Sequence, residues 1–121
     1  MTTSVFSEIL EEVVQSLPGA RGAIFVDWEG EAVDTCSTIG DTGIKLVGAY
    51  WGIVYRHLRA SLKKLEAGSP IEVVMSFSRQ LVVIRRVTDD YIVVFTLAEG
   101  SNLGRALGLM DWAAGKLRAE M

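Results

Sequence analysis

The sequence predicts an α/β protein of the α+β kind, in which helices cover both faces of one five-stranded antiparallel sheet. Three segments have apolar residues at helical spacing, and five shorter segments between them are rich in β-branched and aromatic residues. Two of the five are apolar at successive positions, which is typical of strands buried on both faces. We therefore expect the order α-β-β-α-β-β-β-α, folded as a three-layer α/β/α sandwich in a single domain, 1–121.

The first helix and the first hairpin are predicted from residues 3 to 37. Apolar side chains within 3–16 recur at i, i+3, i+4 and i+7, Ser4 is suited to the N-cap, and the Pro-Gly pair at 18–19 ends the helix. The segments 22–27 and 31–37 have strand character and are separated by a short connection that contains a glycine. This pattern indicates a β-hairpin.

The longest helix is predicted over residues 41–67, which contain no proline. At roughly 100° per residue, one apolar stripe is expected to lie on the sheet. Its members are Ile44, Val47, Trp51, Val54, Tyr55, Leu58, Leu62 and Leu65. A second stripe consists of Leu46, Tyr50, Ile53 and His57. Because a lone domain needs only one apolar stripe on a surface helix, the second stripe needs another explanation.

Three strands and a last helix complete the predicted fold. The segments 71–77, 81–87 and 91–97 are strand-like and are joined by short polar turns, which predicts an antiparallel meander. From Ser101 onward, apolar residues recur at helical spacing, with Ser101 or Asn102 as the N-cap.

The composition excludes several classes of function. The net charge is −3 and no run of Lys or Arg adjoins aromatic residues, so we expect no nucleic-acid partner. Cys36 is the only cysteine and His57 the only histidine, which excludes an internal disulfide and leaves too few ligands for zinc. No apolar run approaches the roughly 18 residues that span a membrane, and the N-terminus lacks a signal-peptide pattern. We expect a cytoplasmic protein without membrane insertion.

The stretch STIGDTGIK, residues 37–45, contains glycines and a lysine, as phosphate-binding loops do. In such loops backbone N–H groups at a helix start hold the anion. The spacing differs from that of a nucleotide-binding loop, and Asp41 would place a carboxylate where the phosphate must lie. We favour the alternative that Asp41 or Thr42 is the N-cap of the long helix.

Candidate catalytic and metal-binding residues do not form a recognisable site. His57 has no serine or cysteine at a suggestive spacing and no obvious carboxylate to orient it, so we expect it at an interface or in a partly exposed packing role. Cys36 is expected to be a small packed residue. The acidic residues within 27–34 and at 89–90 lack the spacing of a calcium loop. The sequence therefore predicts no catalytic residue, no metal site and no cofactor.

Two features point to contact with another protein. Gly48 and Gly52 lie four residues apart on the long helix and cost helix propensity, which the close approach of another backbone would explain. Together with the second stripe, they favour a symmetric dimer through this helix, although the sheet of the same subunit is an alternative reason for the glycines. Trp28, at the hairpin tip, is either a contact residue or packs against a neighbouring helix.

The whole chain resembles the roadblock family, named for a light chain of dynein. The resemblance rests on the order of the elements, on Pro18 and Gly19 after the first helix, on the GAIFVDWEGEAV hairpin with Gly30 in its turn, and on the SNLGRAL entry to the last helix. It implies a profilin-like or longin-like fold. It also implies a homodimer, or a heterodimer with a paralogue, in which the long helices pair and the third strands join edge to edge.

The resemblance also implies a function. Bacterial and archaeal relatives act as partners or activators of Ras-like small GTPases, so we expect a non-enzymatic dimeric regulator or scaffold that binds such a GTPase and modulates its nucleotide state. The alternative is a structural adaptor dimer in a motor or signalling complex without a GTPase partner. The expected GTPase contacts are Tyr50, Arg56, His57 and Arg59. The expected dimer interface consists of Leu46, Gly48, Tyr50, Gly52, Ile53, Ile71 and Val73.

Overall fold

The computed structural model describes residues 4–37 and 40–121, without the side chains of residues 41 and 42. The elements are α1 (Val5–Ser16), β1 (Ala20–Asp27), β2 (Ala32–Ser37), α2 (Asp41–Ser61), the 3-10 turn η1 (Lys63–Leu65), β3 (Glu72–Ser76), β4 (Gln80–Thr88), β5 (Tyr91–Ala98) and α3 (Leu103–Ala119). The predicted order of helices and strands is confirmed.

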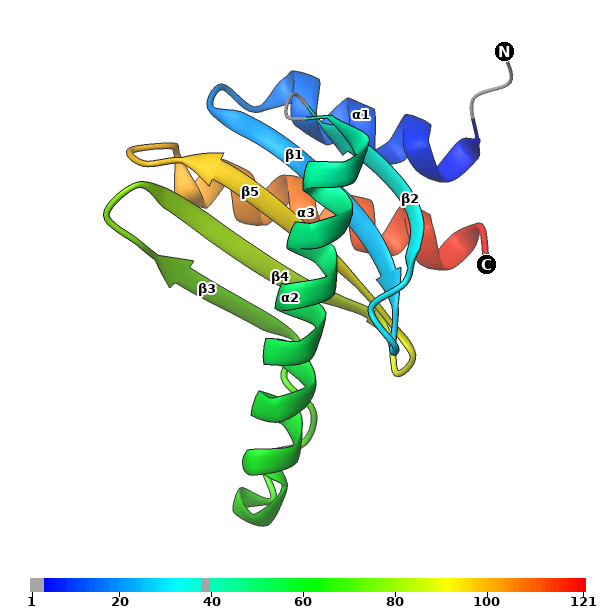
Figure 1. Cartoon of the computed structure of the whole chain (residues 1–121), viewed down its shortest axis with the longest axis vertical. Coiled ribbons are helices and arrows are strands. Elements are labelled where there is room, and N and C mark those ends of the chain that lie inside the picture. The colour runs from blue at the N-terminus through cyan, green and yellow to red at the C-terminus, as the bar shows by residue number, and fades with distance from the viewer. Residues whose placement is uncertain (1–3, 38–39) are drawn as a thin grey trace.

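The strands form one antiparallel sheet in the order β2-β1-β5-β4-β3, so that β2 and β3 lie at its edges. Helix α2 crosses one face of the sheet, while α1 and α3 lie side by side on the other face (Figure 1). The predicted three-layer α/β/α arrangement is therefore confirmed.

Two apolar cores lie on opposite faces of the sheet, because successive side chains of a strand point to opposite sides. In β4, Val82 and Ile84 belong to the core under α2, whereas Leu81 and Val83 belong to the core under α1 and α3. All four are buried, as their successive apolar positions predicted. Phe25 is fully buried in the larger core, and burial of such a side chain contributes about 1.5–3 kcal/mol.

The predicted caps of the two terminal helices are confirmed. The Ser4 hydroxyl accepts a hydrogen bond from the backbone N–H of Ser7 at 3.1 Å. The side-chain oxygen of Asn102 accepts one from the backbone N–H of Arg105 at 3.0 Å. Each bond satisfies one of the N–H groups that a helix start leaves without an intrahelical partner.

The start of α2 differs from the prediction. The helix begins at Asp41 itself, so Gly40, with a φ of 86°, occupies the N-cap position in place of Asp41 or Thr42. A positive φ at this position favours glycine. The alternative of anion binding by STIGDTGIK involves residues 38 and 39 and the side chains of 41 and 42, which lie outside the described residues.

The C-terminal half of α2 projects beyond the sheet (Figure 1). The helix ends at Ser61, six residues before the predicted end, and η1 follows. Val54 and Leu65, which were predicted to lie in the core, are 41% and 68% exposed. Val54 lies on the side of α2 that faces away from the sheet, whereas Leu65 lies in η1, after the projecting half of the helix. Tyr55 remains buried, and its hydroxyl donates a hydrogen bond to the carbonyl oxygen of Pro70 at 2.6 Å.

The two glycines of α2 face the sheet of the same protomer, and the prediction that they belong to a dimer interface is wrong. A Cβ atom on Gly48 would lie 2.6 Å from Cδ1 of Ile24 and 3.0 Å from Cγ1 of Val26. A Cβ atom on Gly52 would lie 3.4 Å from the Cα atom of Gly30. Because both glycines are buried within the protomer, a second subunit cannot contact them.

Candidate functional site

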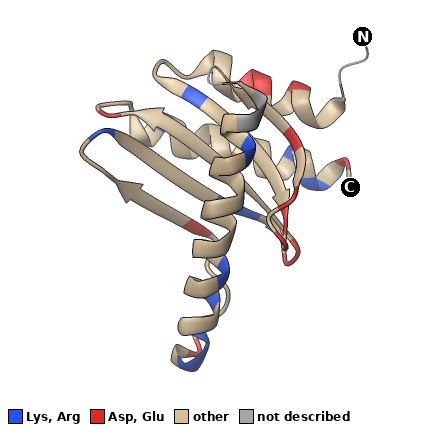
Figure 2. Ribbon diagram, in the orientation of Figure 1, with Lys and Arg blue, Asp and Glu red and all other residues tan. Residues whose placement is uncertain are grey.

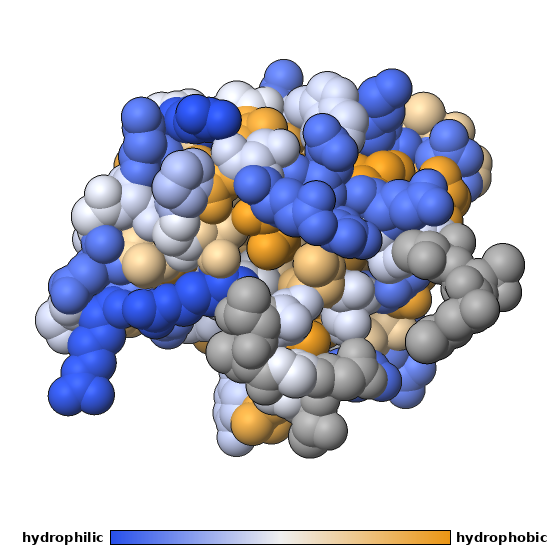
Figure 3. Space-filling view, turned by 90° about the horizontal axis from the view of Figure 1, so that it is seen from above, coloured by the Kyte–Doolittle hydropathy of each residue, from blue (hydrophilic) through white to orange (hydrophobic). Residues whose placement is uncertain are grey.

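The side of α2 that points away from the sheet carries exposed apolar residues. Leu46, Tyr50, Ile53 and Val54 are 58%, 63%, 42% and 41% exposed, and we refer to these four residues as the outward stripe. They recur at i, i+4, i+7 and i+8, which places them on one helical face. At the end of the molecule seen in Figure 3, by contrast, hydrophobic surface is divided into small patches among hydrophilic side chains.

Apolar surface is also exposed around the edge strand β3. Ile71, Val74 and Phe77, which lie within or beside β3, are 55%, 39% and 44% exposed. The ring of Phe77 packs against that of Trp51 of α2, with centroids 5.7 Å apart. Within the described chain β3 pairs with β4 alone, so one row of its backbone groups faces outward.

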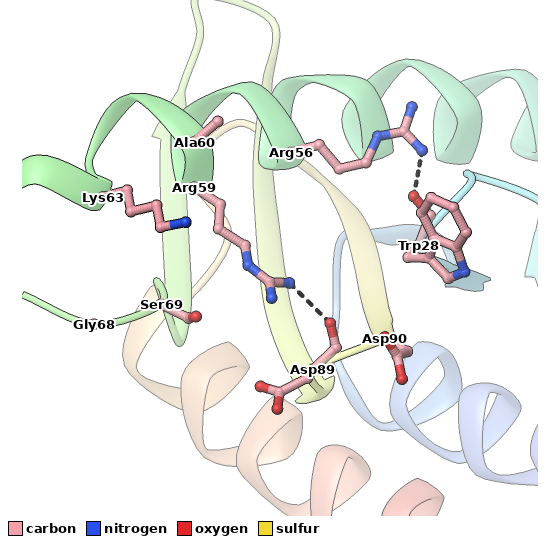
Figure 4. A pocket seen from close by; sticks show the side chains of 9 residues that line it. All are labelled: Trp28, Arg56, Arg59, Ala60, Lys63, Gly68, Ser69, Asp89 and Asp90. Carbon is pink, nitrogen blue, oxygen red and sulfur yellow. Dashed lines mark hydrogen bonds between the residues drawn. The ribbon is translucent and has the colours of Figure 1, made fainter.

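A cavity of about 580 Å³ lies on another side of α2. We call it the basic cavity, because Arg56, Arg59 and Lys63 line it at i, i+3 and i+7 of the helical segment. Trp28 of the β1–β2 turn and Asp89 of the β4–β5 turn face these cations (Figure 4). The two turns meet here because β5 pairs with both neighbouring strands at this end of the sheet. Tyr91 of β5 lies opposite Asp27 of β1 and opposite Thr88 of β4.

Backbone carbonyl groups hold the two arginines of the basic cavity in place. Nη1 of Arg56 donates a hydrogen bond to the carbonyl oxygen of Trp28, and Nη1 of Arg59 donates one to that of Asp89 at 2.8 Å (Figure 4). A carbonyl group orients a guanidinium without neutralising its charge. Among the described residues, no carboxylate forms an ion pair with Arg56, Arg59 or Lys63.

The acidic residues at the cavity compensate little of this positive charge. The carboxylate of Asp89 is paired with Arg86, with Nη1 and Oδ1 2.7 Å apart, and therefore does not neutralise the cations from α2. The carboxylate of Asp90 also lies at the rim, but it points away from α2 (Figure 4). Figure 2 shows the same separation of charge, with Lys and Arg along the lower part of α2.

The structure separates the four residues that were predicted to contact a GTPase. Tyr50 and His57 are exposed on the outward side of α2, whereas Arg56 and Arg59 line the basic cavity. Tyr50 and Arg56 are six residues apart, which is about 120° around the helix. The four therefore belong to two surfaces. The predicted interface residues Leu46 and Ile53 lie beside Tyr50, and Ile71 and Val73 lie at β3.

Sequence reasoning identified part of the basic cavity. Trp28 was a candidate contact residue, and at 59% exposure it has little contact with the core. Lys63 was not among the predicted contact residues, and its i+7 spacing from Arg56 was the available signal. The approach of Ser69 and of the turn at Asp89 depends on tertiary structure, and no sequence signal predicted it.

Neither the single cysteine nor the acidic side chains form a reactive or metal-binding site among the described residues. Burial, with a smaller effect from the nearby Glu11 carboxylate, raises the pKa of Cys36, which disfavours its thiolate. Among residues 4–37 and 40–121, no group of three or more His, Cys, Asp or Glu side chains could hold a metal ion. No helix in that part of the chain has both the length and the apolar character to cross a membrane.

Solved structures of known proteins share this fold over nearly their whole length. A Roadblock/LC7 domain from Streptomyces avermitilis has a TM-score of 0.86 at 12% identity and covers 93% of this chain and 94% of its own. The gliding protein MglB from Thermus thermophilus has a TM-score of 0.85 at 17% identity, covering 98% and 93%, and another MglB structure has a tetrameric arrangement. MglC from Myxococcus xanthus is 30% identical, with a TM-score of 0.68 and coverage of 96% and 98%. No protein-family model and no curated protein matches the sequence.

The solved structures identify both the fold and the family of this chain. The layered fold with one long helix on its own face is that of the Roadblock/LC7 domain, at about the same chain length. With 30% identity to MglC over nearly all of both chains, and with the order of elements expected from the sequence, this chain belongs to the roadblock family.

Proposed function

We propose that this chain is a non-enzymatic, dimeric regulator that binds a Ras-like small GTPase and modulates its nucleotide state. Membership of the roadblock family supports this function, because the resemblance implies a GTPase partner. The observation that carries the proposal is the exposed apolar side of α2, since a helix that already covers a sheet with one face needs no second apolar face in a monomer.

The proposed dimer forms through the outward stripe and the edge of β3. Monomeric proteins rarely leave a contiguous apolar patch of this kind uncovered, and an unpaired strand edge is a template for pairing with another chain. Leu46, Tyr50 and Ile53 would pack against the same residues of a second copy around a two-fold axis. The tetrameric arrangement of an MglB supports self-association in this fold.

The dimer can be tested by sedimentation velocity. The double variant Leu46→Glu with Ile53→Glu places four carboxylates in the proposed two-fold interface and is expected to be monomeric. Val33→Glu is the control for an exposed apolar residue, because Val33 is 41% exposed, close to the 42% of Ile53, but lies on β2 at the opposite edge of the sheet from β3. A double variant that keeps the mass of the wild type would show that the copies associate through another surface.

The GTPase partner can be tested by capture and then by kinetics. The purified protein is used as bait in a lysate of the source organism, with GTP and then with GDP, and mass spectrometry identifies the proteins retained. We expect a Ras-like GTPase whose recovery depends on the nucleotide. Its rates of hydrolysis and nucleotide exchange are then measured with and without this protein, and at least one should change. Recovery of non-GTPase proteins alone would favour the structural adaptor.

A further inference from the structure

The basic cavity has a charge opposite to that of the whole chain. Arg56, Arg59 and Lys63 contribute three positive charges without an ion pair among the described residues, whereas the chain carries a net charge of −3. Asp89 is already paired with Arg86, and Asp90 points away from α2. The cavity therefore favours an anionic ligand, because a positive charge placed against these cations would be destabilising and a negative one would complement them.

The wall of the cavity also includes accessible apolar surface. Trp28 is 59% exposed at the tip of its turn, and the carbonyl group of the same residue accepts the hydrogen bond from Arg56. Tryptophan and arginine are the residue types that most often dominate the binding energy of protein interfaces. A free phosphate would contact the cations and leave the indole uncovered, whereas a peptide segment with carboxylates and an apolar side chain would cover both.

The cavity stays accessible in the proposed dimer. Arg56 and Arg59 lie about 120° and 180° around α2 from Tyr50, so pairing of the outward stripes does not cover them. Its volume of about 580 Å³ lies within the range of about 300–1,000 Å³ that is usual for ligand sites, and is large enough for several side chains.

We propose that the basic cavity binds an acidic segment of the GTPase partner, with carboxylates against Arg59 and Lys63 and an apolar side chain against Trp28. The identity of the partner rests on the proposed function. The prediction that the bound segment is acidic rests on the charge of the cavity alone. Arg56 and Arg59 are already oriented by the carbonyl groups of the two turns, which reduces the conformational entropy lost when a carboxylate binds.

The test uses the whole chain labelled with ¹⁵N and an acetylated peptide of alternating aspartate, glutamate and leucine. A second peptide has asparagine and glutamine at the acidic positions. We expect the acidic peptide to shift the NMR signals of the Trp28 indole N–H and of residues 56–63 and 89–90. The shifts should weaken as salt rises from about 0.15 to about 1 M, because the Debye length falls from about 8 Å to about 3 Å.

Matched variants separate the cavity from general electrostatic attraction. Arg59→Gln with Lys63→Gln removes two charges from the cavity and is expected to weaken peptide binding about fivefold to tenfold. Lys64→Gln with Lys116→Gln removes two exposed charges elsewhere and should leave the affinity unchanged. Lys63→Gln alone retains the bond from Arg59 to the Asp89 carbonyl group and should give part of the loss.

Several results would overturn the acidic-segment proposal. These are equal shifts from the neutral peptide, an equal loss in the Lys64 and Lys116 variant, no shift at Trp28, or tighter binding of inorganic phosphate at the same residues. Capture of a GTPase equally by the wild type and by the Arg59 and Lys63 variant would also overturn it, while leaving the proposed function intact. Specific binding of the acidic peptide without capture of any GTPase would instead overturn the identity of the partner.

Discussion

Substitution of Gly48 by alanine measures how closely α2 packs on its own sheet. The new methyl group would lie 2.6 Å from Cδ1 and 3.0 Å from Cγ2 of Ile24, and 3.0 Å from Cγ1 of Val26. Cδ1 of Ile24 can move away by rotation of the side chain. Cγ2 of Ile24 and Cγ1 of Val26 are bonded directly to the Cβ atoms of buried β1, so the helix must move instead. Overpacking costs about 1–3 kcal/mol, and alanine regains about 1 kcal/mol of helix propensity. We expect a net loss of about 0–2 kcal/mol.

Gly108→Ala in α3 is the matched control. No atom lies within 4 Å of the position of its Cβ, so the gain in helix propensity is unopposed and we expect about 1 kcal/mol of stabilisation. Urea unfolding followed by circular dichroism gives both free energies of unfolding. The Gly48 variant should be less stable than the Gly108 variant by about 1–3 kcal/mol, which is the steric term alone.

Two outcomes would refute this explanation of Gly48. Equal stabilisation by the two substitutions would show that the helix does not pack on Ile24 and Val26 at these distances. A loss for Gly48→Ala that grows as the protein is diluted would show that the glycine contributes to association of subunits, because the stability of a dimer depends on protein concentration.

Three further predictions concern the core and its titrating groups. Phe25→Ala should cost about 3–5 kcal/mol in urea unfolding, because Phe25 is fully buried, and a loss below about 1 kcal/mol would contradict its place in the core. Tyr55→Phe should cost about 1 kcal/mol through loss of the bond to Pro70. Since burial raises the pKa of Tyr55, the wild type should lose stability above about pH 10, where the unfolded tyrosine ionises first, and the variant should lack this loss. Burial likewise raises the pKa of Cys36, so iodoacetamide should alkylate it more slowly in the folded than in the urea-unfolded protein at pH 8; equal rates would refute this.

The elements of the fold could be predicted because each carries a local signal. The apolar run at Leu81–Ile84 requires cover on both faces of a strand, and the structure provides α1 and α3 on one face and α2 on the other. Ser4 and Asn102 are capping residues by their own chemistry, so their roles do not depend on distant parts of the chain.

The errors arose where tertiary structure decides. The periodicity of α2 continues past the sheet, so a stripe read from the sequence assigns Leu65 to a core that does not extend as far as η1, and it places Val54 on the sheet side although this residue faces away from the sheet. Helix propensity predicts that Gly48 destabilises the helix relative to alanine, but it does not predict which backbone or side chain packs against this glycine. The basic cavity needs the turns at Trp28 and Asp89 side by side, and the pairing of β1 with β5 determines this.

The three sides of α2 can be separated by experiment because each has its own physical readout. A change on the sheet side, such as Gly48→Ala, alters the free energy of unfolding at every protein concentration. In the proposed dimer, a disruptive change in the outward stripe at Ile53 lowers the mass and removes the dependence of stability on protein concentration. A change at Lys63 in the basic cavity should alter neither, because this side chain has no partner among the described residues, and should appear only as weaker, less salt-sensitive binding of an acidic partner. A substitution that changed two of these readouts together would show that the corresponding surfaces are coupled.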